Sequence, residues 1–259
     1  TPIKSSAASD VYKRQAVERR DEASLLENTI NQLDAEDCLR HINGRLYGND
    51  YEERLFNVAM ELCITWMNRI LFLKLLEAQM LKYHNGDAIY KFLSITKIHD
   101  YDDLNTLFFQ VLARDMGSRT HSIMRDFAYV PYLNSSLFEV TDLESKTIKI
   151  NSLSQRTVLP VLASSVLRNK KRNLQVNALP TLQYLFAFLD AYNFASEGSE
   201  EVQEEAKTLI NASVLGLIFE KINGHKDGSV FTPGFITMFM CREAITKTCL
   251  LYNLTLPTT

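Results

Sequence analysis

The pattern of apolar and polar positions predicts a chain built mostly of helices. Leucine and isoleucine recur at near-helical spacing from about residue 16 to residue 46, which indicates a first helical region. Between Tyr51 and Tyr83, apolar side chains cover most of the helical circumference and leave one narrow polar stripe. A helix that is apolar on nearly all sides is a buried helix, so we expect this segment to be the centre of the core. The polar stripe consists of Asn57, Glu61, Thr65 and Asn68.

This central helix also carries a charge among its apolar residues. Arg69 should find a carboxylate or carbonyl partner, because an unpaired buried charge is costly. The helix should end near Asn85-Gly86, where a left-handed residue can close it. The side chains expected to be mostly buried on it are Phe56, Met60, Cys63, Trp66, Met67, Ile70 and Leu73.

The middle of the chain has a less regular pattern. A helix is expected over residues 102–114, with Asp102 or Asp103 as its N-cap. Residues 129–140 contain a proline and an Asn-Ser-Ser turn, which favour a loop with short extended pieces. Residues 146–153 alternate isoleucine with lysine and predict one strand.

Two further helices are expected in the second half of the chain. One covers residues 179–194, with Pro180 near its first turn, and the other runs from Ile210 to about Ile222 and ends at Gly224. The strand signals are too few for a large sheet. The predicted fold class is therefore mainly α, a helical domain with few short strands.

Composition narrows the class of protein. The 259 residues are 46% apolar and 23% charged, which is typical of a soluble globular protein. A net charge of −3 gives no overall basic field that would indicate nucleic acid or an anionic membrane as partner. No apolar run is long enough to span a membrane. Four cysteines without CxxC spacing, and no signal peptide, predict reduced thiols in a cytoplasmic protein; they are Cys38, Cys63, Cys241 and Cys249.

Two segments resemble parts of known metal sites, but each lacks a ligand or a neighbouring strand that the site would need. The run Asn223–Gly228 resembles the first half of an EF-hand loop, but its twelfth position is Gly234 instead of a bidentate glutamate, and one carboxylate cannot hold calcium. Glu144-Ser145-Lys146, preceded by an aspartate at 142, resembles the triplet of metal-dependent nucleases. The strand that should carry the distant aspartate is missing, so a solvated loop is expected there. The five histidines show no metal-ligand spacing, and no metal site is predicted.

Other chemical motifs are weak or absent. The sequence contains no GxSxG, no Walker loop and no GxGxxG. The basic run Arg168–Arg172 could touch a phosphate backbone, although so short a cluster is usually a solvated turn. Thr232 suits an N-cap and Pro233 the first helical position. The amino end of that helix could face an anion, or could simply be well capped.

The segment "LGLIFEKINGHKDGSVFTPGFITMFMCREAI" resembles the entry to the catalytic domain of amino-methylating DNA methyltransferases, especially fused type IIG restriction–modification enzymes. That family has a Leu-Gly-x-x-(Phe/Tyr)-Glu helix before a Gly-x-(Phe/Tyr)-(Tyr/Phe)-Thr-Pro turn, and Val230 replaces the first aromatic here. Upstream, "MNRILFLKLLEAQML" and "VPYLNSSLFE" resemble segments of the same enzymes, with Ser135 and Ser136 where two glycines are usual. The matching residues are Leu215, Gly216, Phe219, Glu220, Gly228, Phe231, Thr232 and Pro233.

The resemblance implies an adenine-specific DNA methyltransferase that uses S-adenosylmethionine and acts on double-stranded DNA. Phe231, Thr232 and Pro233 would border the methionine end of the cofactor, and the flipped adenine would accept the methyl group. The glycine-rich loop and the (Asp/Asn/Ser)-Pro-Pro-(Tyr/Phe) segment that this chemistry needs do not occur in the sequence. The chain itself would therefore be an inactive fragment with no catalytic residue.

The expected organisation follows from this resemblance. Residues 1–15 and 249–259 look like a non-native leader and tail, 16–205 form the helical region, and 206–248 begin an incomplete methyltransferase domain. Without its sheet, the last helix should expose apolar residues such as Phe235, Met238 and Phe239. The alternative is a self-contained helical module that interacts with protein or DNA and has no enzymatic activity.

Overall fold

The structure is a computed structural model that describes residues 24–150, 158–162, 165–167, 177–194, 208–210, 214, 218 and 234–251. The chain divides into two compact units. The larger covers Val11–Asn211, and the smaller joins Thr1–Asp10 to Ala212–Thr259.

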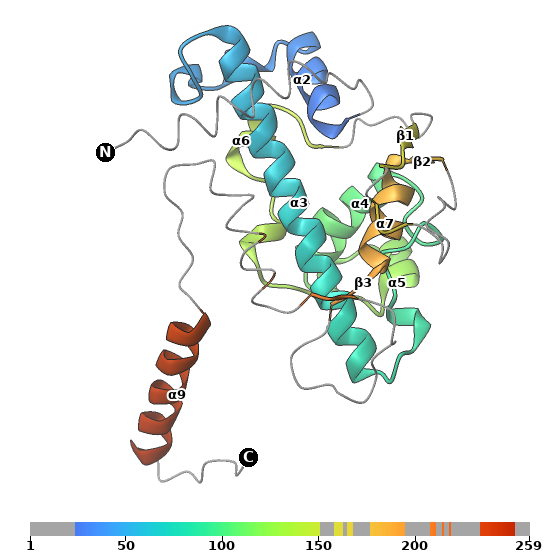
Figure 1. The fold of residues 1–259 in the computed structure, drawn as a ribbon, viewed down its shortest axis with the longest axis vertical. Helices are drawn as coiled ribbons and strands as arrows, with labels where there is room; N and C mark the ends of the chain where they lie inside the picture. The colour runs from blue at the N-terminus through green and yellow to red at the C-terminus, as the bar shows by residue number, and fades with distance from the viewer. Residues whose placement is uncertain are drawn as a thin grey trace. The chain divides into compact units, whose positions relative to one another are not determined.

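The described part of the chain is mainly helical, as predicted (Figure 1). Its α-helices are α2 (Leu25–Ala35), α3 (Tyr51–Tyr83), α4 (Tyr101–Thr106), α5 (His121–Phe127), α6 (Asp142–Lys146), α7 (Thr181–Asp190) and α9 (Gly234–Leu251). Short 3₁₀-helices are η1 (Cys38–His41), η2 (Gly44–Leu46), η3 (Ala88–Tyr90), η5 (Met116–Ser118) and η6 (Ser136–Phe138), and η4 (Leu107–Leu112) is a π-helix. The strands are β1 (Val158–Pro160), β2 (Ala178–Pro180), β3 (Tyr192–Asn193) and β4 (Thr208–Leu209).

Helix α3, with 33 residues, is the centre of the larger unit. The carboxylate of Asp50 caps its amino end by accepting the N–H of Glu53 at 2.8 Å. At the other end Asn85 and Gly86 both have positive φ, and the Gly86 N–H donates to the carbonyl of Leu81 at 2.7 Å. This left-handed closure confirms the predicted end of the helix.

The side chains expected to be buried on α3 are covered to different degrees. Cys63, Trp66, Ile70 and Leu73 are buried as expected, whereas Phe56, Met60 and Met67 are only half-buried. None of the seven is exposed, so the expected position of α3 in the core is confirmed, with three of its side chains only partly covered. The fully covered positions recur at steps of three and four and form one stripe, which leaves the three half-buried side chains on its flanks. This stripe includes Leu55, Val58, Ala59, Leu62, Trp66, Arg69, Ile70, Leu73 and Glu77.

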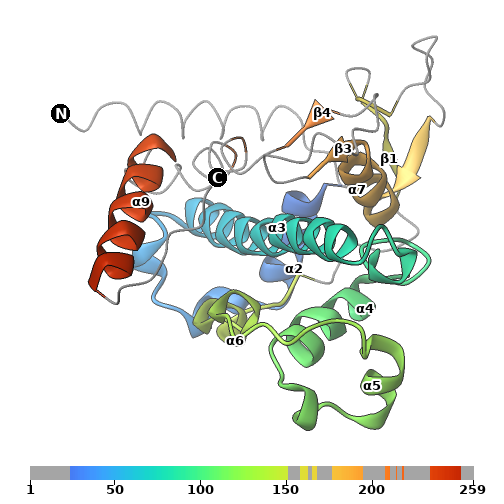
Figure 2. The same cartoon turned by 90° about the horizontal axis from the view of Figure 1, so that it is seen from below.

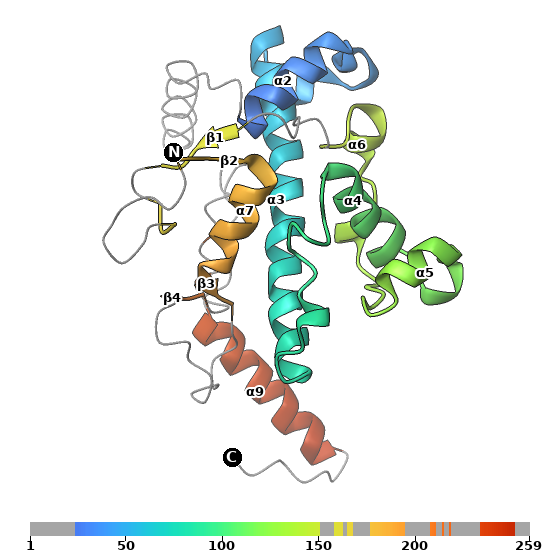
Figure 3. The same ribbon diagram turned by 90° about the vertical axis from the view of Figure 1, so that its right-hand side faces the viewer.

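The other elements of the larger unit pack around α3. Helix α2 packs against it through buried Thr29 and Leu33, and the Thr29 hydroxyl lies 3.7 Å from the sulfur of Cys63. Helix α7 lies on one flank of α3, and α4, α5 and α6 lie on the other (Figures 2 and 3). Residues 16–23 of the expected first helical region lie outside the described residues.

Helix α4 and the π-helix η4 confirm the helix expected over residues 102–114, but its cap differs. The N-cap is Asp100, whose carboxylate accepts the N–H of Asp103 at 2.8 Å, and neither Asp102 nor Asp103 serves as cap. The π-helix then widens the turn, so that two adjacent pairs of side chains face the core. These pairs are Leu107 with Phe108 and Val111 with Leu112.

The strand expected over residues 146–153 is wrong where the structure describes it. Thr147 to Ile150 form no strand and follow α6 directly. The side chains do alternate between core and solvent, because Ile148 and Ile150 are buried while Lys149 is exposed. However, no described strand pairs with these residues. Residues 129–140 form an irregular segment with a single 3₁₀ turn, η6, close to the expected loop.

The strands that the structure describes make two small pairs. β1 and β2 pair in antiparallel fashion, with Leu159 opposite Leu179, and β3 pairs in parallel with β4. Helix α7 then begins at Thr181, with Pro180 as its N-cap, as predicted for this region. A helix was expected from Ile210 to about Ile222. Ile210 is not helical. Among the later positions the structure describes only Val214 and Ile218, and both are helical.

Candidate functional site

The side chain of Arg69, on α3, makes four hydrogen bonds and is 1% exposed. Its guanidinium donates two hydrogen bonds to the carboxylate of Glu144, at 2.5 and 2.8 Å. It also donates to the carbonyls of Leu137, at 2.7 Å, and Glu139, at 2.8 Å. The expectation that this arginine finds a carboxylate or carbonyl partner is confirmed, and it finds both.

Glu144, the partner of Arg69, does not lie in the solvated loop that was expected at this position. Glu144 belongs to α6 and is buried, so the triplet Glu144–Lys146 is not the solvated loop that the sequence suggested. A capping box forms this short helix: the Thr141 hydroxyl accepts the Glu144 N–H, and the Glu144 carboxylate accepts the Thr141 N–H. Burial alone would raise the pKa of Glu144, but the hydrogen bonds from Arg69 and Thr141 hold it below the usual 4.5.

A second buried group of charges joins α3 to α7. Lys74 donates to Glu77 at 2.6 Å and to Asp190, at the end of α7, at 2.5 Å. Glu77 also accepts the N–H of Leu93 at 2.6 Å, and Lys91 reaches Asp190 at 2.7 Å. These charges are paired on all sides, which makes them a structural link and not a reactive site.

The two carboxyl groups of this cluster have pKa values shifted in opposite directions. Burial raises the pKa of Glu77 above its usual value, although Lys74 and the Leu93 N–H act against it. Burial would raise the pKa of Asp190 as well, but the two lysines lower it overall. Lys74 keeps its charge, because the two carboxylates outweigh burial and its pKa is raised.

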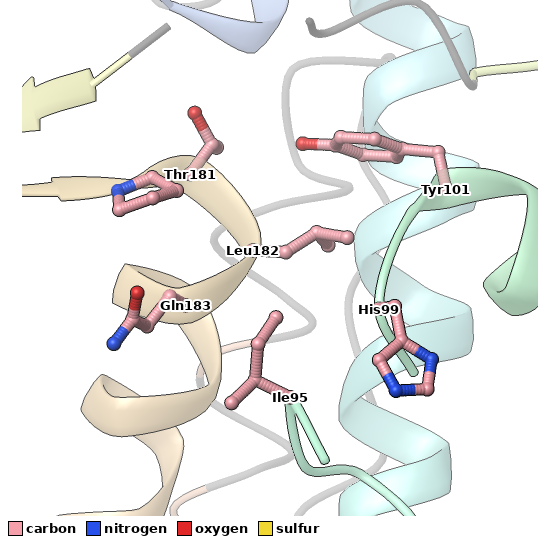
Figure 4. A pocket seen from close by; sticks show the side chains of 7 residues that line it. Ile95, His99, Tyr101, Thr181, Leu182 and Gln183 are labelled. Carbon is pink, nitrogen blue, oxygen red and sulfur yellow. The ribbon is translucent and has the colours of Figure 1, made fainter. Parts of the chain in front are cut away.

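A small pocket lies between the first turn of α7 and the segment that leads into α4 (Figure 4). Its volume is about 200 Å³. Apolar groups make up much of its wall, and Tyr101, Thr181 and the amide of Gln183 bring the polar ones. The lining residues are Ile95, His99, Tyr101, Pro180, Thr181, Leu182 and Gln183.

The Tyr101 and Thr181 hydroxyls lie next to each other in this pocket, and Thr181 is the hydrogen-bonding neighbour of Tyr101. The Tyr101 hydroxyl points toward the first turn of α7 (Figure 4). Burial raises the pKa of Tyr101, and the nearby Thr181 hydroxyl partly offsets this. The indole N–H of Trp66 is buried and makes no hydrogen bond within the described part of the chain, and its ring lies 6.0 Å from that of Tyr101, centroid to centroid.

The first turn of α7 adds further donors. Its N-cap is Pro180, so no side chain caps the free N–H groups of the helix. The sequence did not single out Tyr101 or Thr181, because residues 80 positions apart meet only through the packing of α4 and α7. The one local signal was Pro180-Thr181, which opens a helix without a Ser, Asn or Asp cap.

The predicted cofactor residues Phe231, Thr232 and Pro233 lie outside the described residues. Helix α9 begins directly after them, at Gly234, and continues through Leu251. The expected non-native tail, 249–259, therefore has its first three residues in this helix. Met238 and Phe239 are exposed, as expected, and the side chain of Phe235 is outside the described set.

The described residues contain no group of three or more metal-binding side chains. Cys38, Cys63 and Cys241 are free, and burial raises the pKa of the Cys63 thiol to about 11, which makes it a poor nucleophile. Among the helices that the structure describes, none is both long enough and apolar enough to cross a bilayer.

Comparison with known proteins identifies one family. A family model described as a domain of unknown function (DUF7814) matches residues 3–210 of the 259. The match includes most of the expected leader and ends beside the boundary of the larger compact unit at Asn211. No curated protein and no solved structure matches the chain. The chain therefore belongs to the DUF7814 family.

Proposed function

We propose that this chain supplies the helical scaffold of an S-adenosylmethionine-dependent, adenine-specific DNA methyltransferase of a restriction–modification system. In this proposal the larger unit carries no catalytic residue. Its role is to hold the segment that enters the catalytic domain and to present it to the rest of the enzyme on double-stranded DNA.

The observation that carries the proposal is the position of Arg69. The resemblance to the methyltransferases rests on three segments in matching order, and Arg69 belongs to the first of them, residues 67–81. Two of its hydrogen bonds go to carbonyls of the second, Leu137 and Glu139. Two segments that the resemblance singles out independently thus meet through one buried side chain. Such a contact is expected if both belong to one structural unit of the proposed enzyme.

The irregular backbone of the second segment explains why a buried arginine is useful. Residues 129–140 lack a helical or sheet ladder for most of their carbonyls. A guanidinium offers five N–H donors in a rigid fork, and in α3 four of its hydrogen bonds fix this segment and α6 together. The scaffold would in this way keep its shape without a sheet.

The experiment is methyl transfer by the complete gene product. It should transfer a tritiated methyl group from S-adenosylmethionine to adenine in double-stranded DNA, and digestion to nucleosides should recover the label as N6-methyl-2′-deoxyadenosine. A folded full-length protein that labels no adenine would contradict the proposal and favour a helical interaction module. For the variant Arg69→Met, which is discussed below, Arg125→Met is the matched control, because Arg125 is exposed and forms an ion pair with its neighbour Asp126.

A further inference from the structure

We propose that helix α9 pairs in antiparallel orientation with α9 of a second copy of this chain. The contact face consists of Ile236, Met240, Glu243 and Lys247, which follow one another at steps of four, three and four along the helix and so lie on one side of it. The proposal concerns α9 alone, and it does not depend on the methyltransferase proposal.

The exposed apolar side chains of α9 are the first reason to expect a partner. Met240 is 61% exposed, and its neighbours Met238 and Phe239 are 72% and 63% exposed. A surface helix normally turns a polar face toward water, but residues 234–241 contain no charged side chain. Exposed apolar surface that is contiguous in this way marks an interaction site.

The charges of α9 lie in its second half and distinguish two faces of the helix. One side carries Met238, Cys241 and Ile245 without a charge among them, and it suits the interior of a folded unit. The contact face carries Glu243 and Lys247 one turn apart, and both side chains are exposed. A face that places two opposite charges beside apolar residues suits a partner whose charges match them.

These two charges select a second copy and its direction. In a parallel pair in register, Glu243 would face Glu243 and Lys247 would face Lys247, which is unfavourable. In an antiparallel pair with its two-fold axis at the level of Ile245, Glu243 of each helix faces Lys247 of the other. The same axis places Met240 opposite position 250, which is a leucine. A surface that matches itself under a two-fold rotation is what an isologous contact requires.

The first measurement is the state of association in solution. A contact made by one face of an 18-residue helix belongs with the small, transient interfaces that bury less than about 1,200 Å² in total, so the dimer should dissociate on dilution. Sedimentation velocity of the full chain, from low micromolar to submillimolar, should show a rapid monomer–dimer equilibrium. A reducing agent is present because Cys241 is exposed and free. A sedimentation coefficient that does not rise with concentration would overturn the proposal.

Charge reversal tests the antiparallel register. Glu243→Lys turns each pair across the contact into two lysines, and Lys247→Glu turns each into two glutamates, so each variant alone should dimerise at least about tenfold more weakly. An equimolar mixture of the two variants should form a heterodimer about as tight as the wild-type dimer. The double variant Glu243→Lys/Lys247→Glu should recover the dimer as well. Arg242→Glu is the control, because Arg242 lies off the contact face, and it should dimerise like the wild type.

The remaining outcomes decide between this face and others. Circular dichroism should be the same for all variants, because the replaced side chains are exposed. Equal dimer affinity in the wild type and both single variants would place the contact elsewhere and overturn the proposal. A mixture of the two single variants that stays monomeric, while the wild type dimerises, would overturn the antiparallel register.

Discussion

Arg69 and Glu144 lie 75 positions apart in the chain and form a two-point ion pair inside the larger unit. Each is nearly inaccessible to solvent, at 1% and 4% of side-chain exposure. The pair therefore ties the middle of α3 to the start of α6 in a place where neither charge can be hydrated. Stability should depend on both charges being present together.

Removing one partner should be strongly destabilising. Arg69→Met leaves the Glu144 carboxylate buried without its cation, and we expect it to lower the free energy of unfolding by about 3–5 kcal/mol. Urea unfolding followed by circular dichroism measures this. Arg125→Met should leave the unfolding midpoint unchanged. The double variant Arg69→Met/Glu144→Leu should recover part of the loss, because no charge remains buried; no recovery would mean that the bonds to the Leu137 and Glu139 carbonyls dominate.

Acid should weaken the fold through Glu144. Its folded pKa lies below the ordinary 4.5, so the stability it contributes is complete above that value and is lost as the pH falls through the folded pKa. The free energy of unfolding should fall between about pH 5 and about pH 3, and less steeply in Glu144→Gln. Asp190 acts in the same direction and Glu77 in the opposite one, so the variant is compared with the wild type at each pH. Equal slopes in both proteins would contradict the assignment.

The end of α3 offers a test of backbone conformation alone. Gly86 has a φ of +80°, and a Cβ built on it would meet nothing within 4 Å. Gly86→Ala should therefore cost about 1 kcal/mol through its left-handed conformation and not through a clash. The control is Gly117→Ala, where φ is not positive and the added Cβ meets only the Asp115 carboxylate, at 3.3 Å. Equal stability of wild type and Gly86→Ala would show that this turn is not needed to close the helix.

The chain by itself should have no methyltransferase or nuclease activity and no measurable affinity for S-adenosylmethionine. A helix amino end at an exposed site contributes about 0.3–1 kcal/mol toward an anion, whereas micromolar binding takes about 8 kcal/mol. Calorimetry at micromolar protein should detect no heat of binding. In the methyltransferase proposed above, Thr232→Ala should weaken cofactor binding and destabilise its helix by about 1 kcal/mol. Identical cofactor affinity in wild type and variant would mean that Thr232 is only a helix cap.

Local sequence patterns predicted the helices well, but they did not predict which residues the helices contact. The cost of burying a charge predicted that Arg69 would have partners, but not that Glu144 would be one of them. A local signal existed, since Thr141 and Glu144 have the spacing of a capping box and so indicate a helix where a solvated loop was expected. The choice of cap for α4 was ambiguous because three aspartates follow one another closely, and Asp100 was the one with the correct extended backbone.

The pocket could not be predicted, for a different reason. Neither Tyr101 nor Thr181 belongs to a motif, and each is an ordinary residue at a helix start. Their importance comes from the packing of α4 and α7 around α3, which places the two hydroxyls close together. Periodicity reports which face of a helix is apolar but not which other helix covers it.

The link between Lys74 and Asp190 also has a consequence for synthesis on the ribosome. The two residues are 116 positions apart, so the lysine leaves the ribosome long before its partner has been translated. Until then α3 can pack against the elements already translated, such as α2. The ammonium of Lys74 stays solvated, and the apolar side chains of α3 that α7 will cover stay exposed. Closing so long a loop is entropically costly and must await α7. The nascent chain therefore passes through a stage in which the α7-facing flank of its central helix is unprotected, and this is the stage at which a chaperone would be needed.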